Sequence, residues 1–241
     1  MPGILQAPQR ATPKVLNEQG NDLDKNFKAI LDRYYLSAMP PTYIGGGQKN
    51  VVKISAGGLL RLMGSATVWQ DIDFPLIAKT TGANTPAYNT FLGNLTMLQW
   101  AVNDVLQLDS REFHHGWMEG SPVEWHCHIV TGGTNNADRY LKFEIEFAWA
   151  NYLGNGSATY AAPVTMTSAE LLIPANTPAY THIYYDIGFW TPTGGKIGGH
   201  VKARFKRVAS TGTAPTANPF CEMVQLHIEC DSWGSAEETI K

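Results

Sequence analysis

From residue 66 onward, the chain is built of segments in which apolar and polar residues alternate, separated by linkers rich in Gly, Asn, Thr and Pro. In segment 139–149, Phe143, Ile145 and Phe147 share one face, and charged residues occupy the other. A period of two predicts a half-buried strand. The predicted strands cover 68–74, 97–103, 122–130, 139–149, 163–173, 179–189, 200–208 and 222–231. They predict an all-β fold, a jelly-roll-like β-sandwich of about eight antiparallel strands.

A different pattern precedes the sandwich. Residues 1–20 are polar and rich in proline, which predicts an arm that orders only on a partner. Residues 21–35 begin with an Asn/Asp cap and predict one short helix. Its apolar stripe either docks on the protein's own sheet or forms a short oligomer bundle. The predicted oligomer or anchor contacts on this stripe are Leu23, Phe27, Ile30 and Tyr34.

Glycine-rich segments separate the helix from the sandwich. Residues 45–47 and 57–58 are glycines, and they bracket a short predicted strand at 50–55. We therefore expect two parts. Residues 1–65 form an anchoring arm, a short helix and a hinge, and residues 66–241 form the β-sandwich domain.

Charge and cysteine content exclude several classes of partner. Charged residues make up 16% of the 241 residues, the net charge is −3 and no basic run is present, so nucleic acid is not expected to bind. With no long apolar run and no signal-peptide pattern, the chain is expected to be neither membrane-embedded nor secreted. The three cysteines lack metal-binding spacing, and Cys127 and Cys230 fall on core-facing positions.

Histidines concentrate in the segment 112–128. His126 and His128 lie two residues apart on a predicted strand, so both imidazoles point to one side. Together with Gly120 they match the opening G-x5-H-x-H of the cupin motif, which leaves a cupin-like metalloenzyme as one alternative. No glutamate ligand follows in 129–133, and 192–200 has poor spacing for a second motif. We therefore expect no catalytic residues and no cofactor, and keep His126 and His128 as the only metal candidates.

Several motifs occur in a fixed order along residues 66–235: Trp69-Gln70-Asp71-Ile72-Asp73-Phe74-Pro75, Glu112-Phe113-His114-His115, Met118-Glu119-Gly120, Pro122-Val123-Glu124-Trp125-His126-Cys127-His128, the aromatic strand 140–152, and His227-Ile228-Glu229-Cys230-Asp231-Ser232-Trp233-Gly234-Ser235. In this order they resemble a group of virion structural proteins of tailed bacteriophages. The resemblance departs at Ile129, where that group has tryptophan.

The resemblance implies a non-enzymatic module that assembles as a homotrimer in the virion, after synthesis in the host cytoplasm. It would decorate the capsid, project as a head fibre, or belong to the neck or tail. Its partners would be further copies of itself and other virion proteins, such as capsid, portal, neck or tail proteins. The histidines would be architectural. A second alternative is a receptor- or glycan-binding module of the virion, with Trp117 and Trp190 as the possible glycan contacts.

Overall fold

The computed structural model describes residues 42–44, 51–54, 60–77, 84–151 and 159–235. The chain divides into two compact units, of which the first comprises 1–67 with 231–233 and the second 68–230 with 234–241. The predicted arm, the predicted helix and both glycine segments lie outside the described residues, and so do the stripe residues Leu23, Phe27, Ile30 and Tyr34.

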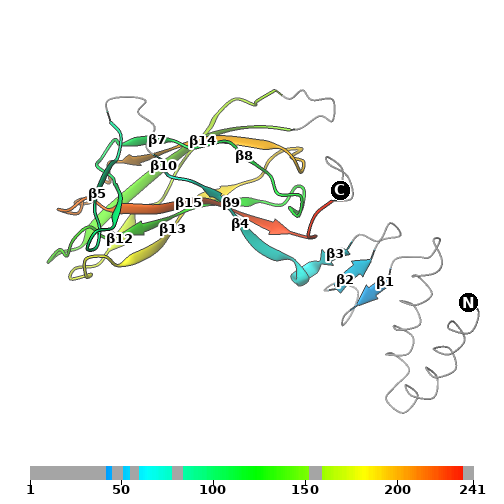
Figure 1. Cartoon of the computed structure of the whole chain (residues 1–241), viewed down its shortest axis with the longest axis horizontal. Coiled ribbons are helices and arrows are strands. Elements are labelled where there is room, and N and C mark those ends of the chain that lie inside the picture. Colours follow the sequence, from blue (N-terminus) through cyan, green and yellow to red (C-terminus); the bar gives the residue numbers. More distant parts are fainter. Residues whose placement is uncertain (1–41, 45–50, 55–59, 78–83, 152–158, 236–241) are drawn as a thin grey trace, which may run out of the picture. The chain divides into compact units, whose positions relative to one another are not determined.

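The second unit is built almost entirely of strands (Figure 1). They are β4 (Val68–Phe74), β5 (Ala87–Thr90), β6 (Thr96–Gln99), β7 (Val105–Gln107), β8 (Arg111–Glu112), β9 (Val123–Val130), β10 (Arg139–Ala150), β11 (Val164–Thr167), β12 (Leu171–Ile173), β13 (His182–Trp190), β14 (His200–Val208) and β15 (Phe220–Cys230).

These strands pair in a nested order. The first strand, β4, pairs with the last, β15; β7 and β8 pair with β14; β9 pairs with β13; and β10 pairs with β11 and β12, all antiparallel. One sheet has the order β4-β15-β9-β13, with β6 also paired to β15 and β5 paired to β6, and the other has β14 and β10 at its centre. This nesting is the jelly roll, so the predicted fold class is confirmed.

The core lies between the two sheets and follows the predicted alternation. Trp125 of β9 packs against Phe74 of β4 and Phe147 of β10, with ring centroids 5.0 and 5.4 Å apart. Phe143 and Phe205 stack at 4.9 Å across β10 and β14. All three cysteines are buried and free, which confirms the core positions predicted for Cys127 and Cys230.

Two predicted strands are shorter than expected. The segment 163–173 breaks into β11 and β12 at Ser168, because its hydroxyl oxygen accepts the Phe143 N–H at 3.1 Å in place of a backbone carbonyl. The segment 97–103 leaves the sheet after Gln99, where Asp104 accepts the Ala101 N–H at 2.6 Å in a tight turn. The short strands β5, β7 and β8 were not predicted.

The first unit contains a small antiparallel sheet with the order β1-β2-β3. Its strands are β1 (Thr42–Ile44), β2 (Val51–Ile54) and β3 (Leu60–Met63), and a 3-10 turn follows at Gly64–Ala66. The predicted strand 50–55 is therefore confirmed as β2, whereas β1 and β3 were missed. Within the described ranges of the whole chain, no helix has the length and apolar character of a membrane span.

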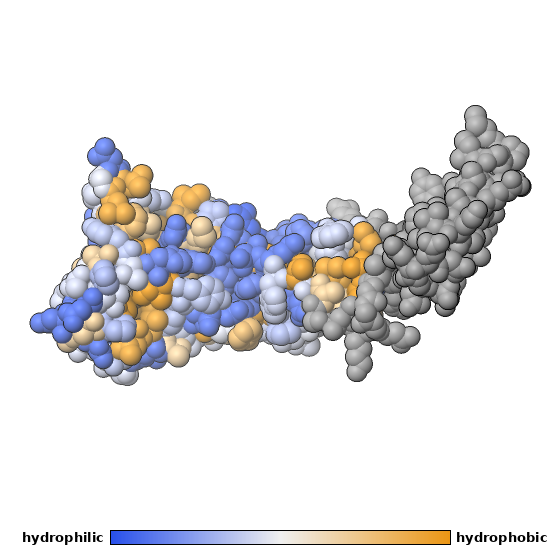
Figure 2. Space-filling model, turned by 90° about the horizontal axis from the view of Figure 1, so that it is seen from below, coloured by the Kyte–Doolittle hydropathy of each residue, from blue (hydrophilic) through white to orange (hydrophobic). Residues whose placement is uncertain are grey.

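The surface of the sandwich is mixed. Apolar residues form separate patches among polar ones on the face shown in Figure 2. The most exposed large hydrophobic side chains of the sandwich are Leu95, Phe189, Tyr88 and Ile77.

Candidate functional site

Polar and ionisable side chains gather on the outer face of the β4-β15-β9-β13 sheet. Along β9 the side chains of Trp125, Cys127 and Ile129 face the core, so those of Glu124, His126 and His128 face outward. The same alternation on the neighbouring strands brings Asp71, Asp73, His182, Tyr184, Asp186, Gln225, His227 and Glu229 to this face. No Lys or Arg occurs in these four strands, all of which are described.

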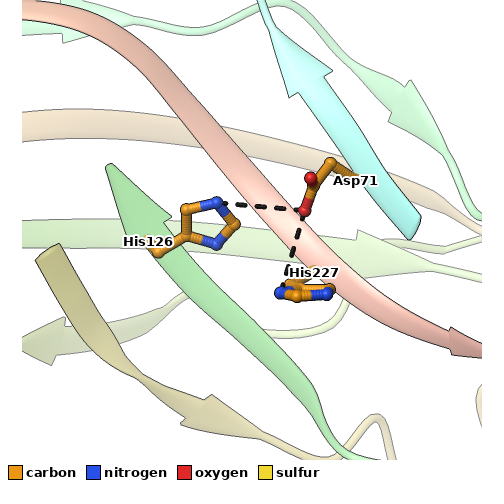
Figure 3. Close-up of side chains that lie close together, drawn as sticks. All are labelled: Asp71, His126 and His227. Carbon is orange, nitrogen blue, oxygen red and sulfur yellow. Dashed lines mark ion pairs between the residues drawn. The ribbon is translucent and has the colours of Figure 1, made fainter. Parts of the chain in front are cut away.

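Three of these side chains converge at the centre of the face (Figure 3). Asp71 of β4 lies between His126 of β9 and His227 of β15, with its Oδ1 atom 3.8 Å from His126 Nε2 and 3.8 Å from His227 Nδ1. One potential ligand atom from each residue lies within 4.8 Å of the other two. The strand register creates this cluster, because His227 is directly opposite both Asp71 and Glu124.

His126 is the most deeply buried member of the cluster. Its side chain is covered although it points outward, and the residue is 1% exposed. Its Nε2 atom lies 2.9 Å from Gln225 Oε1, and Gln225 in turn donates its amide N–H to Asp73 at 2.5 Å. Burial lowers the pKa of His126, because the charged imidazolium loses hydration in this position. A neutral imidazole is the form that can bind a metal ion.

Glu124 and Asp186 form a second acidic group beside the cluster. Burial, the hydrogen bond to Asp186 and the negative charge of Asp186 together raise the pKa of Glu124 to about 7. Glu124 Oε2 also lies 3.9 Å from His227 Nδ1. Burial and the Glu124 charge raise the pKa of Tyr184, which keeps this phenol protonated. The face therefore concentrates acidic side chains that no Lys or Arg from its own strands offsets.

His128 does not join this cluster, although the sequence pattern paired it with His126 as a metal candidate. Its Nδ1 atom lies 2.8 Å from His182 Nε2, and the two rings stack with centroids 5.0 Å apart. The His126 and His128 rings lie 5.4 Å apart on the same face. Any site enclosed inside the sandwich would use the inward positions of β9, and these are Val123, Trp125, Cys127 and Ile129. His126 and His128 thus do not form an internal cupin-type centre.

The other residues of the histidine-rich segment hold its loop in place. Phe113 and Trp117 are buried and stack at 4.5 Å. His114 Nδ1 accepts the Gly116 N–H at 3.0 Å. Glu119 accepts the Ile197 N–H at 3.1 Å and pairs with Lys196 at 2.8 Å.

The predicted glycan contacts need a correction. Trp117 has no exposed surface and cannot stack on a sugar in this conformation, because it fills the core between Phe113 and β15. Trp190 is half-buried and packs against Phe147 and Trp149. Two described tryptophans are exposed: Trp233, at 69%, belongs to the first unit, and Trp69, at 48%, lies on the same outer face of the sandwich as Asp71.

Asp71 and His227 were missed as site residues, although both stand in the motifs quoted for the phage resemblance. Each lies at an outward position of an alternating strand. The missing information was the pairing of the first strand of the sandwich with the last, which a jelly roll supplies.

The chain matches no family model and no curated protein. Two solved structures from infectious bursal disease virus are similar to this chain. A structure of infectious bursal disease virus Gx strain is 10% identical, with a TM-score of 0.31 over 81% of this chain and 37% of that chain. The VP2 subviral particle of infectious bursal disease virus is 9% identical, with a TM-score of 0.31 over 78% of this chain and 37% of that one. This chain therefore spans well under half the length of either, and the matches assign it to no family.

Proposed function

We propose that the chain is a non-enzymatic structural component of a tailed-phage virion. The observation that supports this most is the nested jelly roll of residues 68–230, in which the phage-like motifs serve as architecture. Jelly rolls occur in viral capsid proteins, in lectins and in cupins, so the fold alone does not choose among them. The choice depends on what the motif residues do.

In this chain the motif residues build the sandwich. Phe113 and Trp117 fill its core, and Glu119 binds the backbone of the loop before β14. Trp69-Gln70-Asp71-Ile72-Asp73-Phe74 forms the strand β4, with Ile72 and Phe74 directed to the core. The inward positions of β9 are apolar, which argues against the cupin alternative. A structural role agrees with all of these positions.

We propose that the sandwich is exposed on the particle as decoration, head fibre, or neck or tail appendage, and that residues 1–65 anchor it. The two outer faces of the sandwich differ in charge, since one carries acids and histidines and the other carries Lys202, Arg204 and Lys206 on β14 with Glu144 and Glu146 opposite them on β10. Two unlike patches on one chain favour head-to-tail contacts, which close into a ring such as a trimer only where the rotation between successive subunits closes. The charge difference therefore supports self-association, and the trimer itself rests on the phage resemblance.

The test is to locate the protein and count its copies. We expect mass spectrometry to find the chain in purified particles and an electron-microscopy map to show a jelly roll at a three-fold position. Light scattering of the purified full-length protein should give three times the chain mass of 26.5 kDa. A chain absent from particles that stays monomeric at micromolar concentration would contradict the proposal.

A receptor- or glycan-binding role stays as a second candidate because of exposed aromatic rings on one face. Trp69, Tyr184 and Phe189 are 48%, 46% and 61% exposed on the outer face of the β4-β15-β9-β13 sheet. Aromatic rings of this kind stack on sugars or on protein surfaces. Binding to host cells or to a glycan array, lost in Trp69→Ala and kept in Trp190→Ala, would favour this role. No binding in the wild type would end it.

A further inference from the structure

The cluster at the centre of the acidic face has the composition of a metal centre. Asp71, His126 and His227 come from three neighbouring strands and supply one carboxylate and two imidazoles. We propose that these three residues bind a divalent transition-metal ion of the zinc class. The site is independent of the position of the protein in the virion.

The distances agree with a centre that closes on its ion. An ion about 2.1 Å from each ligand atom holds two tetrahedral ligands about 3.4 Å apart. Asp71 Oδ1 is 3.8 Å from each histidine nitrogen, and all three ligand atoms lie within 4.8 Å of one another, so the site closes on an ion when the Asp71 and His227 side chains both rotate toward His126. Asp71 is 42% exposed at its side chain and can move, whereas His126 is fixed by burial. The exposed side of Asp71 leaves room for water as a further ligand.

The donor atoms select the class of ion. Imidazole nitrogen with carboxylate oxygen suits Zn²⁺, Co²⁺, Ni²⁺ and Fe²⁺, whereas Ca²⁺ and Mg²⁺ prefer oxygen ligands alone. Thiolate does not take part, because all three cysteines are buried and Cys127 and Cys230 point into the core. A fourth ligand is at hand in Glu124, whose Oε2 lies 3.9 Å from His227 Nδ1.

Two observations besides the distances point to a cation here. Within the described residues, the buried Nδ1 atom of His227 has no hydrogen-bond partner, and it faces Asp71 and Glu124. The four strands of this face also carry acids without any Lys or Arg. An ion with charge +2 would provide a partner for His227 Nδ1 and would offset the charge of the acidic side chains.

Binding has a cost that limits its strength. His126 Nε2 lies within hydrogen-bond distance of Gln225 Oε1, and metal binding replaces that bond. The ring must then carry its proton on Nδ1, which has no partner among the described side chains. We therefore expect a dissociation constant in the micromolar range rather than the tighter range of closed zinc sites.

The consequence for the fold is a link across β4. This strand pairs with β15 alone and is the first strand of the second unit. An ion held by β4, β15 and β9 would join this strand to the centre of its sheet. At a free metal concentration a hundredfold above the dissociation constant, we expect the melting temperature to rise by roughly 5 to 10 °C.

The experiment uses the full-length chain without a polyhistidine tag, treated with EDTA and dialysed. Zn²⁺ is titrated by calorimetry, Co²⁺ by its visible absorption, and melting is followed with and without Zn²⁺. We expect one ion per chain. Asp71→Asn and His227→Gln should each weaken binding at least tenfold and remove the rise in melting temperature. Both residues are partly exposed, so these variants should keep the fold, which circular dichroism checks.

His128→Gln is the matched control, because it lies on the same strand and face as His126 but contacts His182. It should bind as the wild type does. The proposal is overturned if the wild type binds no ion stoichiometrically, or if both Asp71→Asn and His227→Gln bind unchanged. It is also overturned if His128→Gln loses binding while His227→Gln keeps it, since the pair His126 and His128 would then be the site.

Discussion

The two sheets of the sandwich have similar inner faces and very different outer faces. Both turn aromatic and branched side chains inward, and the alternation is interrupted in the β4-β15-β9-β13 sheet by bulges at Asp186/Gly188 and Cys221/Met223. Outward, the β4-β15-β9-β13 sheet presents acids and histidines without Lys or Arg, whereas β10 and β14 present basic residues with glutamates between them. The net charge of −3 conceals this contrast, because it sums the charges of all 241 residues wherever they lie. Composition therefore does not predict how charge is distributed over the surface, whereas the register of the strands does.

One basic residue breaks the pattern of the basic sheet, and its removal should have the largest effect on stability. Arg207 of β14 points inward, is 1% exposed and donates N–H groups to Trp100 O at 2.6 Å and Asn218 Oδ1 at 2.8 Å. Arg207→Met leaves the Trp100 carbonyl without this donor. We expect a loss of about 2 to 4 kcal/mol in the free energy of unfolding.

Urea unfolding measures this change, and Lys206→Met is the control. Lys206 is the neighbouring residue but faces outward, so its replacement should change stability by less than about 0.5 kcal/mol. If the two replacements lower the free energy of unfolding equally, the inward Arg207 contributes no more to stability than the outward Lys206, and the prediction is wrong.

A smaller effect is expected where the two sheets are tied together by a phenol. Tyr185 of β13 donates its O–H to Ala169 O and lies 2.5 Å from Ser168 Oγ, beside β11 of the other sheet. Tyr185→Phe removes these bonds and should cost about 1 to 1.5 kcal/mol at neutral pH.

The same residue predicts a loss of stability in alkali. Burial raises the pKa of Tyr185 to about 12. The unfolded chain releases this proton near pH 10 and the folded chain only near pH 12, so stability falls as the pH rises through this window. Melting curves of wild type and Tyr185→Phe should show a shallower decline in the variant. Parallel curves would assign the alkaline loss to other groups.

Sequence predicted the sheet faces because alternation is a local property. The inward residues Phe143, Ile145 and Val201 could be read from a period of two, and each is buried. The short strands β7 and β8 could not be predicted, since two or three residues carry no period. Trp117 was misjudged for the same reason, because it lies in a loop where no alternation says which side is buried.

The candidate site shows the limit of local reasoning more clearly. Sequence placed His126 and His128 on one side of a strand, which is correct, and then joined them to each other. The polar partners of His126 come instead from other strands, Gln225 on β15 and Asp71 on β4. Which residues meet across strands depends on register, and a shift by one residue would turn every one of them to the other face.

The contrast between the faces should also show in self-association. If opposite faces meet in the proposed trimer, neutralising the basic face by Lys202→Gln with Lys206→Gln should weaken association several-fold, or about 1 kcal/mol. Added salt should weaken the wild type in the same direction. Sedimentation at several salt concentrations measures both, and Lys196→Gln, a loop lysine off this face, is the control. If association changes neither with salt nor with these substitutions, the charged faces do not form the trimer interface.

The smallest expected effect concerns the exposed ion pair between Arg204 of β14 and Glu146 of β10, which are opposite each other in the register. Both side chains are about one-third exposed, so water and salt screen their attraction. A double-mutant cycle with both residues changed to Ala should give a coupling free energy of about 0.5 kcal/mol or less. Its disappearance in high salt would fit a screened surface pair. A coupling above about 2 kcal/mol would instead mean that this face is covered and dry in the assembled protein, as it would be if basic and acidic faces pack together.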